Sequence, residues 1–218
     1  MKNILCFGDS NTFGFDPENK GLTDMRFERE ERWTGILQAG LGENCYGLEE
    51  GLGGRTTSFE EPITPGRKGA DFLLPCIHSH QPLDLVILML GTNDVKTIFP
   101  ATAEDIGRGM GKLVEIALNP FATYARKVPQ VLIVAPPPVG AAIEKSPTMA
   151  GSFDLGSRER SLALAGEYQK QAEAYGCHFM DGGAVTAFNE RECVHLDIRG
   201  HRKLGTALIQ RVKEILLP

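Results

Sequence analysis

The stretch LDLVILML, residues 83–90, constrains the fold more than any other part of the sequence. It is apolar almost throughout, yet far too short to cross a membrane as a helix. A short run without polar alternation is typical of a strand that is buried on both faces of a parallel sheet. Shorter apolar runs predict four further strands, at residues 3–7, 45–49, 130–135 and 178–180. We expect residues 83–90 to be the central strand.

Amphipathic segments separate these apolar runs. The clearest one repeats apolar residues three and four positions apart, at Ile106, Met110, Leu113 and Ala117. Helices are predicted at residues 32–41, 67–79, 103–118, 155–175 and 199–216. Strands that alternate with helices predict an α/β fold with a parallel, doubly wound sheet, because parallel neighbours need crossover connections. The length of 218 residues fits one domain that spans residues 1–218.

Charge and cysteine content narrow the class of partner. A net charge of −5 leaves no basic surplus to neutralise phosphates, so neither a nucleic acid nor an anionic membrane is expected. The N-terminus MKNILCFGDS has too short an apolar run for a signal peptide, which predicts a cytoplasmic protein. The five cysteines are odd in number and contain no C-x-x-C pair, so free thiols are expected. A small, neutral molecule is the expected partner.

Three long stretches, residues 11–31, 51–66 and 136–152, match neither a helix nor a strand. Long loops in compact proteins are usually functional. In open α/β sheets the ligand crevice lies beyond the carboxyl ends of the strands, where the strand order reverses. The first strand, in NILCFGDSNTFGF, ends at such a position, and Ser10 stands three residues after its last residue.

Side chains suited to catalysis stand at this expected crevice. Asn93 follows the central strand in LGTND, and Gly54 follows the second strand in EGLGGRTT. Each residue alone also fits an ordinary turn or loop. The last loop adds His195, with Glu192 three residues before it. A neutral imidazole can take a proton from a serine such as Ser10, and a carboxylate on the other ring nitrogen fixes the tautomer.

Four sequence blocks together resemble the SGNH hydrolases, also called the GDSL esterase superfamily. The blocks FGDSNT, GLGGRT, GTND and HLDIRGHRKLG carry Ser10, Gly54, Asn93 and His195, in the family order and across essentially the whole chain. The segments ILCFGDSNT, RWTGILQ, EEGLGGRTT, QPLDLVILMLGTND and VAPPP are similar to a bacterial arylesterase and acyltransferase group.

This resemblance implies a flavodoxin-like, three-layer α/β/α fold with a five-stranded parallel sheet. It implies hydrolysis of short-chain, acetyl-type and aryl esters through an acyl-enzyme, without a metal or other cofactor, and in some members acyl transfer to alcohols or peroxide. It also implies a homo-oligomer that narrows the active-site entrance. The catalytic residues would be Ser10, His195 and Glu192, and the oxyanion hole would consist of the Ser10 and Gly54 backbone N–H groups with the Asn93 side chain.

The sequence departs from the family pattern at two positions. Glu192 stands where the family usually has Asp and is one methylene longer, and Phe13 stands where the arylesterase group commonly has Trp. Glu192 either orients His195 or is solvated, in which case a Ser10–His195 dyad acts alone. Two other functions stay open: an acetyl-carbohydrate esterase with the same triad, and a flavodoxin-like FMN or phosphate-binding module, which would leave the other three blocks without a common purpose.

The histidines His78 and His80, in HSH, are candidate metal ligands by residue type. A third ligand is not evident nearby, and the segment fits the end of a helix, where a histidine interacts favourably with the helix dipole. No metal is therefore expected.

Overall fold

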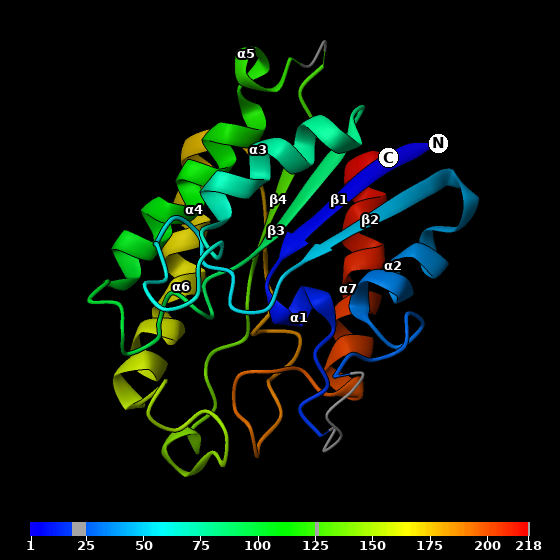
Figure 1. The fold of residues 1–218 in the computed structure, drawn as a ribbon. Helices are drawn as coiled ribbons and strands as arrows, with labels where there is room; N and C mark the ends of the chain where they lie inside the picture. Colours follow the sequence, from blue (N-terminus) through cyan, green and yellow to red (C-terminus); the bar gives the residue numbers. More distant parts are fainter. Residues whose placement is uncertain (19–24, 125–126, 218) are drawn as a thin grey trace.

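A five-stranded parallel sheet forms the centre of the computed structural model, which describes residues 1–18, 25–124 and 127–217 (Figure 1). The strands lie in the order β2-β1-β3-β4-β5. They are β1 (Lys2–Gly8), β2 (Cys45–Gly51), β3 (Leu85–Met89), β4 (Gln130–Ala135) and β5 (His178–Asp181). Every neighbouring pair is parallel, which confirms the predicted sheet. The central strand is shorter than the predicted range of residues 83–90.

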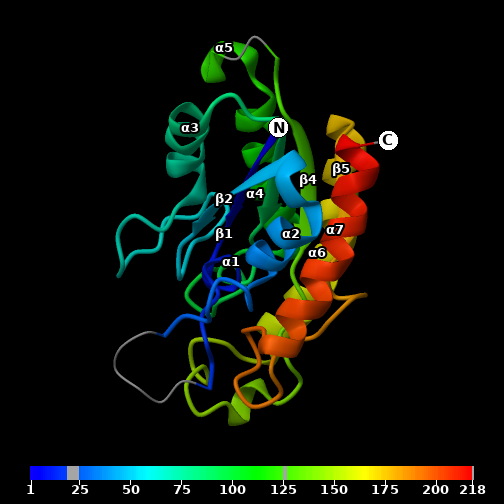
Figure 2. The ribbon, with the colours of Figure 1, turned by 90° about the vertical axis from the view of Figure 1, so that its right-hand side faces the viewer.

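Helices cover both faces of the sheet. The two that pack on one face are α2 (Trp33–Leu41) and α7 (Ile198–Leu216), and those on the other are α3 (Gly69–His80), α4 (Ala103–Leu118) and α6 (Leu155–Tyr175) (Figures 1 and 2). All five predicted helices are therefore present, with ends that differ from prediction by at most two residues. No helix in the described ranges is both long enough and apolar enough to span a membrane.

Alternating side chains of the strands build two separate cores. In β1, Ile4 and Cys6 pack with α2 and α7, whereas Leu5 and Phe7 pack with α3, α4 and α6. All five residues of β3 are buried and divide between the two cores in the same way. Helices cover both faces of β3, so every side chain of the strand is buried whichever face it points to. The strand sequence is therefore a continuous apolar run.

The long stretch 11–31, predicted to match neither a helix nor a strand, begins inside the one-turn helix α1 (Ser10–Phe13). The carboxylate of Asp9 accepts the Asn11 backbone N–H at 2.8 Å and caps the start of the helix. Gly14, in the left-handed conformation with φ of +85°, ends it. Three other one-turn segments were also not predicted, because one turn shows no periodicity: η1 (Gly42–Asn44), α5 (Pro120–Thr123) and η2 (Ile143–Lys145).

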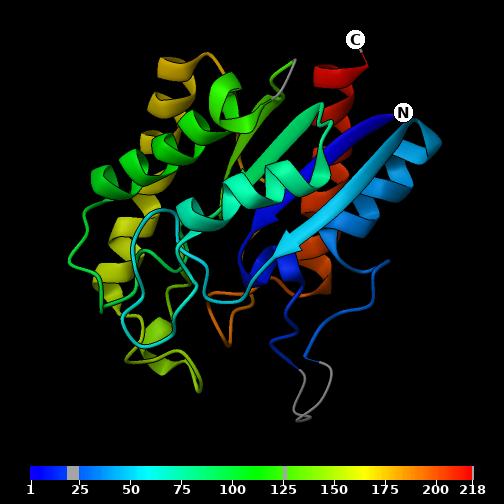
Figure 3. The same ribbon diagram turned by 45° about the horizontal axis from the view of Figure 1, so that its top comes forward.

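The long loops gather at the carboxyl ends of the strands (Figure 3). The predicted stretches 51–66 and 136–152 follow β2 and β4. The stretch 11–31 begins after β1, and its residues 19–24 lie outside the described residues. The chain runs outward from β1 to β2 and then returns to the other side of β1 to form β3. The strand order thus reverses between β1 and β3, where a ligand crevice is expected.

Candidate active site

Ser10 lies at the tight connection between β1 and α1. Gly8, the last residue of β1, leaves no room for a side chain, because a Cβ there would lie 2.0 Å from Oγ1 of Thr12 and 2.7 Å from the Met89 carbonyl oxygen. Glycine therefore allows α1 to fold directly over the ends of β1 and β3. Ser10 is the first residue of α1 and is 7% exposed.

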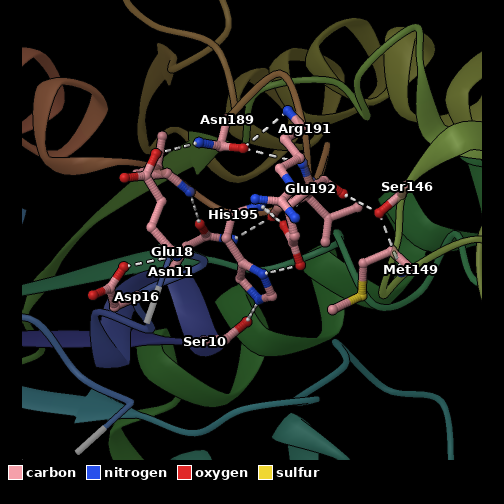
Figure 4. A network of polar contacts seen from close by, with 12 residues as sticks. Ser10, Asn11, Asp16, Glu18, Ser146, Met149, Asn189, Arg191, Glu192 and His195 are labelled. Atoms are coloured by element: carbon pink, nitrogen blue, oxygen red, sulfur yellow. Dashed lines mark hydrogen bonds and ion pairs between the residues drawn. The ribbon is translucent and has the colours of Figure 1, made fainter. Parts of the chain in front are cut away.

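A hydrogen-bonded relay links Ser10, His195 and Glu192 (Figure 4). Nε2 of His195 lies 2.8 Å from Oγ of Ser10, and Nδ1 lies 2.6 Å from Oε1 of Glu192. When the carboxylate accepts the Nδ1 proton, Nε2 presents its lone pair to the serine hydroxyl. Such a relay can take the hydroxyl proton and stabilise the imidazolium that results.

The Glu192 carboxylate is held on both of its oxygens. Its Oε2 accepts the backbone N–H groups of His195 at 2.9 Å and Val194 at 3.2 Å, while Oε1 faces the imidazole. Its side chain is 5% exposed. Of the two alternatives that the sequence left open, a solvated Glu192 does not agree with these contacts. The turn accommodates the extra methylene, because the Glu192 carboxylate extends toward the backbone N–H groups of Val194 and His195.

Asn11 joins the Ser10 turn to the loop that carries His195. Its Nδ2 donates to the Val194 carbonyl at 3.1 Å, and its Oδ1 accepts the Leu196 N–H at 2.9 Å. Both peptide groups that flank His195 are thus bonded to the residue that follows Ser10. The Asn11 carbonyl in turn accepts the indole N–H of Trp33 at 3.1 Å, and the Trp33 side chain is fully buried.

The loop 189–195 closes on itself through Asn189 (Figure 4). The Asn189 N–H donates to the His195 carbonyl at 2.7 Å, and its Oδ1 accepts the Glu192 N–H at 3.0 Å. The Cys193 N–H donates to the Asn189 carbonyl at 2.8 Å. Cys193 has a φ of +76°, which is rare for a residue with a side chain. The loop therefore holds a strained residue between Glu192 and His195.

Asn93 and Gly54 line the same cavity as Ser10. The Asn93 amide donates one N–H to the Arg55 carbonyl at 3.1 Å, which leaves its second N–H available for a ligand. Gly54 has a φ of +79°, in the region that favours glycine. The Arg55 guanidinium donates to the Gly8 carbonyl at 2.9 Å and so ties the Gly54 loop to the end of β1.

The cavity between these residues has a volume of about 230 Å³. Apolar side chains form much of its remaining wall, namely those of Phe15, Met149, Phe153 and Val194. The Phe15 and His195 rings are 4.4 Å apart between centroids. Phe13 stands where the arylesterase group commonly has Trp. It is not one of the described residues that line the cavity. Its ring instead lies 4.3 Å from the Arg26 guanidinium carbon.

Two buried carboxyl groups adjoin the candidate residues in the chain, since Asp9 precedes Ser10 and Asp94 follows Asn93. Burial raises the pKa of Asp9 to about 6, and it raises the pKa of Asp94 to about 6 as well. Oδ1 of Asp94 accepts the Thr57 backbone N–H at 2.8 Å and the Thr57 hydroxyl at 2.5 Å. Both carboxyls therefore change charge close to pH 6, next to the candidate residues.

The histidines of α3 are engaged in local contacts. Nε2 of His78 lies 2.8 Å from the Ala122 carbonyl oxygen, and Nε2 of His80 lies 2.8 Å from Oε1 of Glu50. Within residues 1–18, 25–124 and 127–217, no group of three or more His, Cys, Asp or Glu side chains is placed to hold a metal ion. The five cysteines are free, as predicted. Chemistry without a metal or cofactor stays a prediction.

The structure thus brings together Ser10, His195, Glu192, Asn93 and Gly54, the five residues singled out from the sequence. Sequence reasoning did not identify several neighbours of this group: Asn11, Phe15, Lys96, Met149 and Phe153. The first three lie within five residues of a candidate, so their proximity along the chain was an available signal. The last two come from the loop before α6, and no local pattern indicates that it reaches the cavity.

Comparison with known proteins agrees with this geometry. The sequence matches the model of the GDSL-like lipase/acylhydrolase family over residues 6–203. No curated protein matched the sequence in a further search.

Several solved structures share the whole fold. A carbohydrate acetylesterase from Sinorhizobium meliloti is 36% identical, with a TM-score of 0.92, and the match covers 99% of this chain and 100% of that one. The inhibitor-bound aryl esterase from M. smegmatis is 38% identical, with a TM-score of 0.92 and the same coverage. A putative arylesterase from Agrobacterium tumefaciens is 40% identical, with a TM-score of 0.87, again over 99% and 100% of the two chains. The chain therefore belongs to the GDSL-like lipase/acylhydrolase family of carboxylic ester hydrolases.

Proposed function

We propose that this protein hydrolyses short-chain acyl and aryl esters through an acyl-enzyme formed on Ser10. The observation that carries the proposal is the relay in which His195 contacts the Ser10 hydroxyl at 2.8 Å and the Glu192 carboxylate at 2.6 Å. A cavity of about 230 Å³ in front of Ser10 suits a small acyl group.

In the first half of the reaction, Oγ of Ser10 attacks the ester carbonyl carbon while Nε2 of His195 takes the hydroxyl proton. The tetrahedral intermediate collapses, the ester C–O bond breaks, and the imidazolium returns the proton to the departing alcohol. In the second half, His195 takes a proton from water, the resulting hydroxide attacks the acyl-enzyme, and Ser10 regains its proton as the acid leaves. Glu192 keeps the Nδ1–H tautomer throughout.

The negative charge of the intermediate needs donors that are already in place. We assign this role to the backbone N–H groups of Ser10 and Gly54 and to the Asn93 amide. The contact of Asn93 with the Arg55 carbonyl supports this assignment, because it fixes the amide while one N–H stays free. Preorganised donors of this kind do not have to reorient as charge develops.

The nucleophile is tested by covalent labelling. A p-nitrophenyl organophosphonate should add one phosphonyl group to the purified protein, and peptide mapping should place it on Ser10. The Ser10→Ala variant should lose hydrolysis of p-nitrophenyl acetate, whereas Ser79→Ala, which makes the same change on the exposed side of α3, should keep it. A label on another residue, or an active Ser10→Ala variant, would refute the proposed chemistry.

A second candidate substrate class is acetylated carbohydrate. It is supported by the Sinorhizobium meliloti neighbour, a carbohydrate acetylesterase that is 36% identical to this chain. The same relay serves both substrate classes, so a panel of aryl, alkyl and sugar acetates decides between them. Acyl transfer to alcohols or peroxide is a further proposal, which the same panel tests when an alcohol is added and transesterified product is measured.

We also propose a homo-oligomer. Met149 and Phe153 of the loop before α6 line the cavity, which supports the idea that a neighbouring subunit packed on this loop would narrow the entrance. Light scattering at micromolar concentration should give a multiple of the 23.8 kDa chain mass, and a monomer would refute it. A cytoplasmic location and a single domain over residues 1–218 stay predictions, and so does the absence of nucleic-acid partners.

A further inference from the structure

Lys96 brings an ammonium group to a cavity wall whose other residues, apart from His195, carry no charge. Within the described residues, the cavity lining contains Lys96, the titratable His195, and nine residues that carry no charge. The Lys96 N–H donates to the Asn93 carbonyl at 3.3 Å, so a tight turn places Lys96 next to the proposed oxyanion donor. The catalytic relay described above makes no use of this lysine.

No carboxylate among the described residues pairs with the Lys96 ammonium. Among the carboxylates, that of Glu61 raises the pKa of Lys96 most, although burial has the larger, lowering effect. The two Glu61 oxygens accept the backbone N–H groups of Ile63 at 3.1 Å and Thr64 at 2.7 Å. A second cation lies beside the cavity lining: a Cβ at Gly54 would lie 3.5 Å from Nε of Arg67. Among the described residues, neither Lys96 nor Arg67 forms an ion pair with a carboxylate.

We propose that Lys96 determines substrate specificity by binding a carboxylate on the ester, so that the site takes anionic esters. This inference rests on the proposed esterase function. The carboxylate can stand on the acyl side, as in a half-ester of a dicarboxylic acid, or on the alcohol side, as in an acetylated hydroxy acid. The chemistry of recognition, an ammonium that donates to a carboxylate, is the same in both cases.

The surroundings of Lys96 favour such a ligand. Burial lowers the pKa of Lys96, and the negative charges of Glu61, Asp9 and Asp94 only partly oppose that effect. A bound carboxylate replaces the hydration that the half-buried ammonium has lost. The apolar side chains that line the same cavity lower the local polarity, which strengthens the interaction of the two charges.

A purely structural role for Lys96 makes a different prediction. If Lys96 serves only to offset the buried charges of Asp9 and Asp94, its loss changes the activity toward neutral and anionic esters by the same factor. If it binds the substrate carboxylate, its loss changes the ratio of the two activities. The informative quantity is therefore a ratio of kcat/KM values, compared between wild type and variant.

The experiment measures kcat/KM for two matched pairs of esters. The acyl-side pair is p-nitrophenyl hemisuccinate and p-nitrophenyl butyrate, and the alcohol-side pair is 4-acetoxybenzoate and its methyl ester. The variants are Lys96→Met, which removes the charge at similar volume, and Lys96→Arg, which keeps it. Lys213→Met is the matched control, because it changes the net charge equally on the exposed surface near the end of α7.

We expect Lys96→Met to lower the anionic-to-neutral ratio about tenfold for one of the two pairs, which identifies the side that carries the carboxylate. Lys96→Arg should restore most of the ratio, and Lys213→Met should leave it unchanged. Added salt should shrink the ratio in every protein that keeps a positive charge at position 96, but not in Lys96→Met. If Lys96→Met leaves the ratio unchanged for both pairs, and Ser10→Ala abolishes hydrolysis, the inference about Lys96 is wrong and the proposed function stands. If Ser10→Ala stays active on all four esters, it is the proposed function that fails.

Discussion

Replacing Glu192 with glutamine removes one negative charge and almost no volume. In the native site, one carboxylate oxygen accepts the imidazole N–H of His195 at 2.6 Å, and the other accepts two backbone N–H groups at 2.9 and 3.2 Å. Every neighbour of the carboxylate is thus a donor. An amide has only one acceptor oxygen, so the glutamine side chain cannot satisfy both sides at once.

Each orientation of the new amide has a defined cost. If its oxygen faces the imidazole, its NH₂ group faces two buried backbone donors, and each donor left unsatisfied costs about 1–3 kcal/mol of stability. If its oxygen faces the backbone, the NH₂ group meets Nδ1 and favours the tautomer with the proton on Nε2. That tautomer donates to Ser10 and cannot take its proton, so the relay stops.

We expect Glu192→Gln to lower kcat by about 10³–10⁴, with a small change in KM. This range follows the serine proteases, in which the wrong histidine tautomer costs about 10⁴ in kcat. The Glu192 side chain is only 5% exposed, so it is held in place and we expect the full loss of kcat rather than the smaller loss of a mobile carboxylate.

The assay is hydrolysis of p-nitrophenyl acetate over a range of substrate concentrations, which separates kcat from KM. Glu190→Gln is the matched control, since it makes the same change on an exposed side chain of the same loop and should retain activity. If the kcat of Glu192→Gln stays within a few-fold of wild type, the reasoning is wrong and a Ser10–His195 dyad is sufficient.

Three further results are expected. Asn93→Ala should lower kcat by about 10²–10³ with little change in KM, as for the loss of an oxyanion donor; a steep rise in KM at constant kcat would mean substrate binding instead. Asp9→Asn should reduce the pH dependence of the unfolding free energy. Because the folded pKa of about 6 lies above the unfolded value of 3.8, the wild type gains stability as pH falls through this range, by up to about 3 kcal/mol from Asp9, and the variant lacks that gain. The prediction is wrong if the unfolding free energy, measured by urea titration at several pH values, changes with pH by the same amount in the two proteins. Asn11→Leu should lower both the melting temperature and kcat, because it leaves two buried peptide groups beside His195 without partners; a variant with native kinetics would show that other contacts hold the loop.

The fold could be predicted from the sequence because burial on two faces leaves a direct trace in the residue pattern. β3 is apolar at all five positions, and α4 and α7 show clear helical spacing, so each was recognised within about two residues of its ends. Ser10, Asn93 and His195 were identified because parallel strands bring their following residues to one edge.

Other features of the site depend on contacts that no local pattern encodes. The two-sided hold on Glu192 arises from the turn through Cys193, whose φ of +76° no residue preference predicts. Phe15, and not Phe13, lines the cavity, because α1 ends at Gly14 and the chain then changes direction. Met149 and Phe153 reach the cavity through a loop whose path is set by packing with distant elements.

The two hydrogen bonds of Asn11 connect residues that are 183 and 185 positions apart in the chain. During synthesis, Ser10 therefore leaves the ribosome long before His195 does. The nascent chain cannot hydrolyse esters until the loop that carries His195 has been made. In the finished protein, a local opening that detaches α7 and the loop before it leaves β1 to β4 paired but separates Ser10 from His195. Loss of hydrolysis under mild denaturant should therefore precede loss of the helical and sheet signal, and the enzyme's own turnover reports on this sub-global unfolding step.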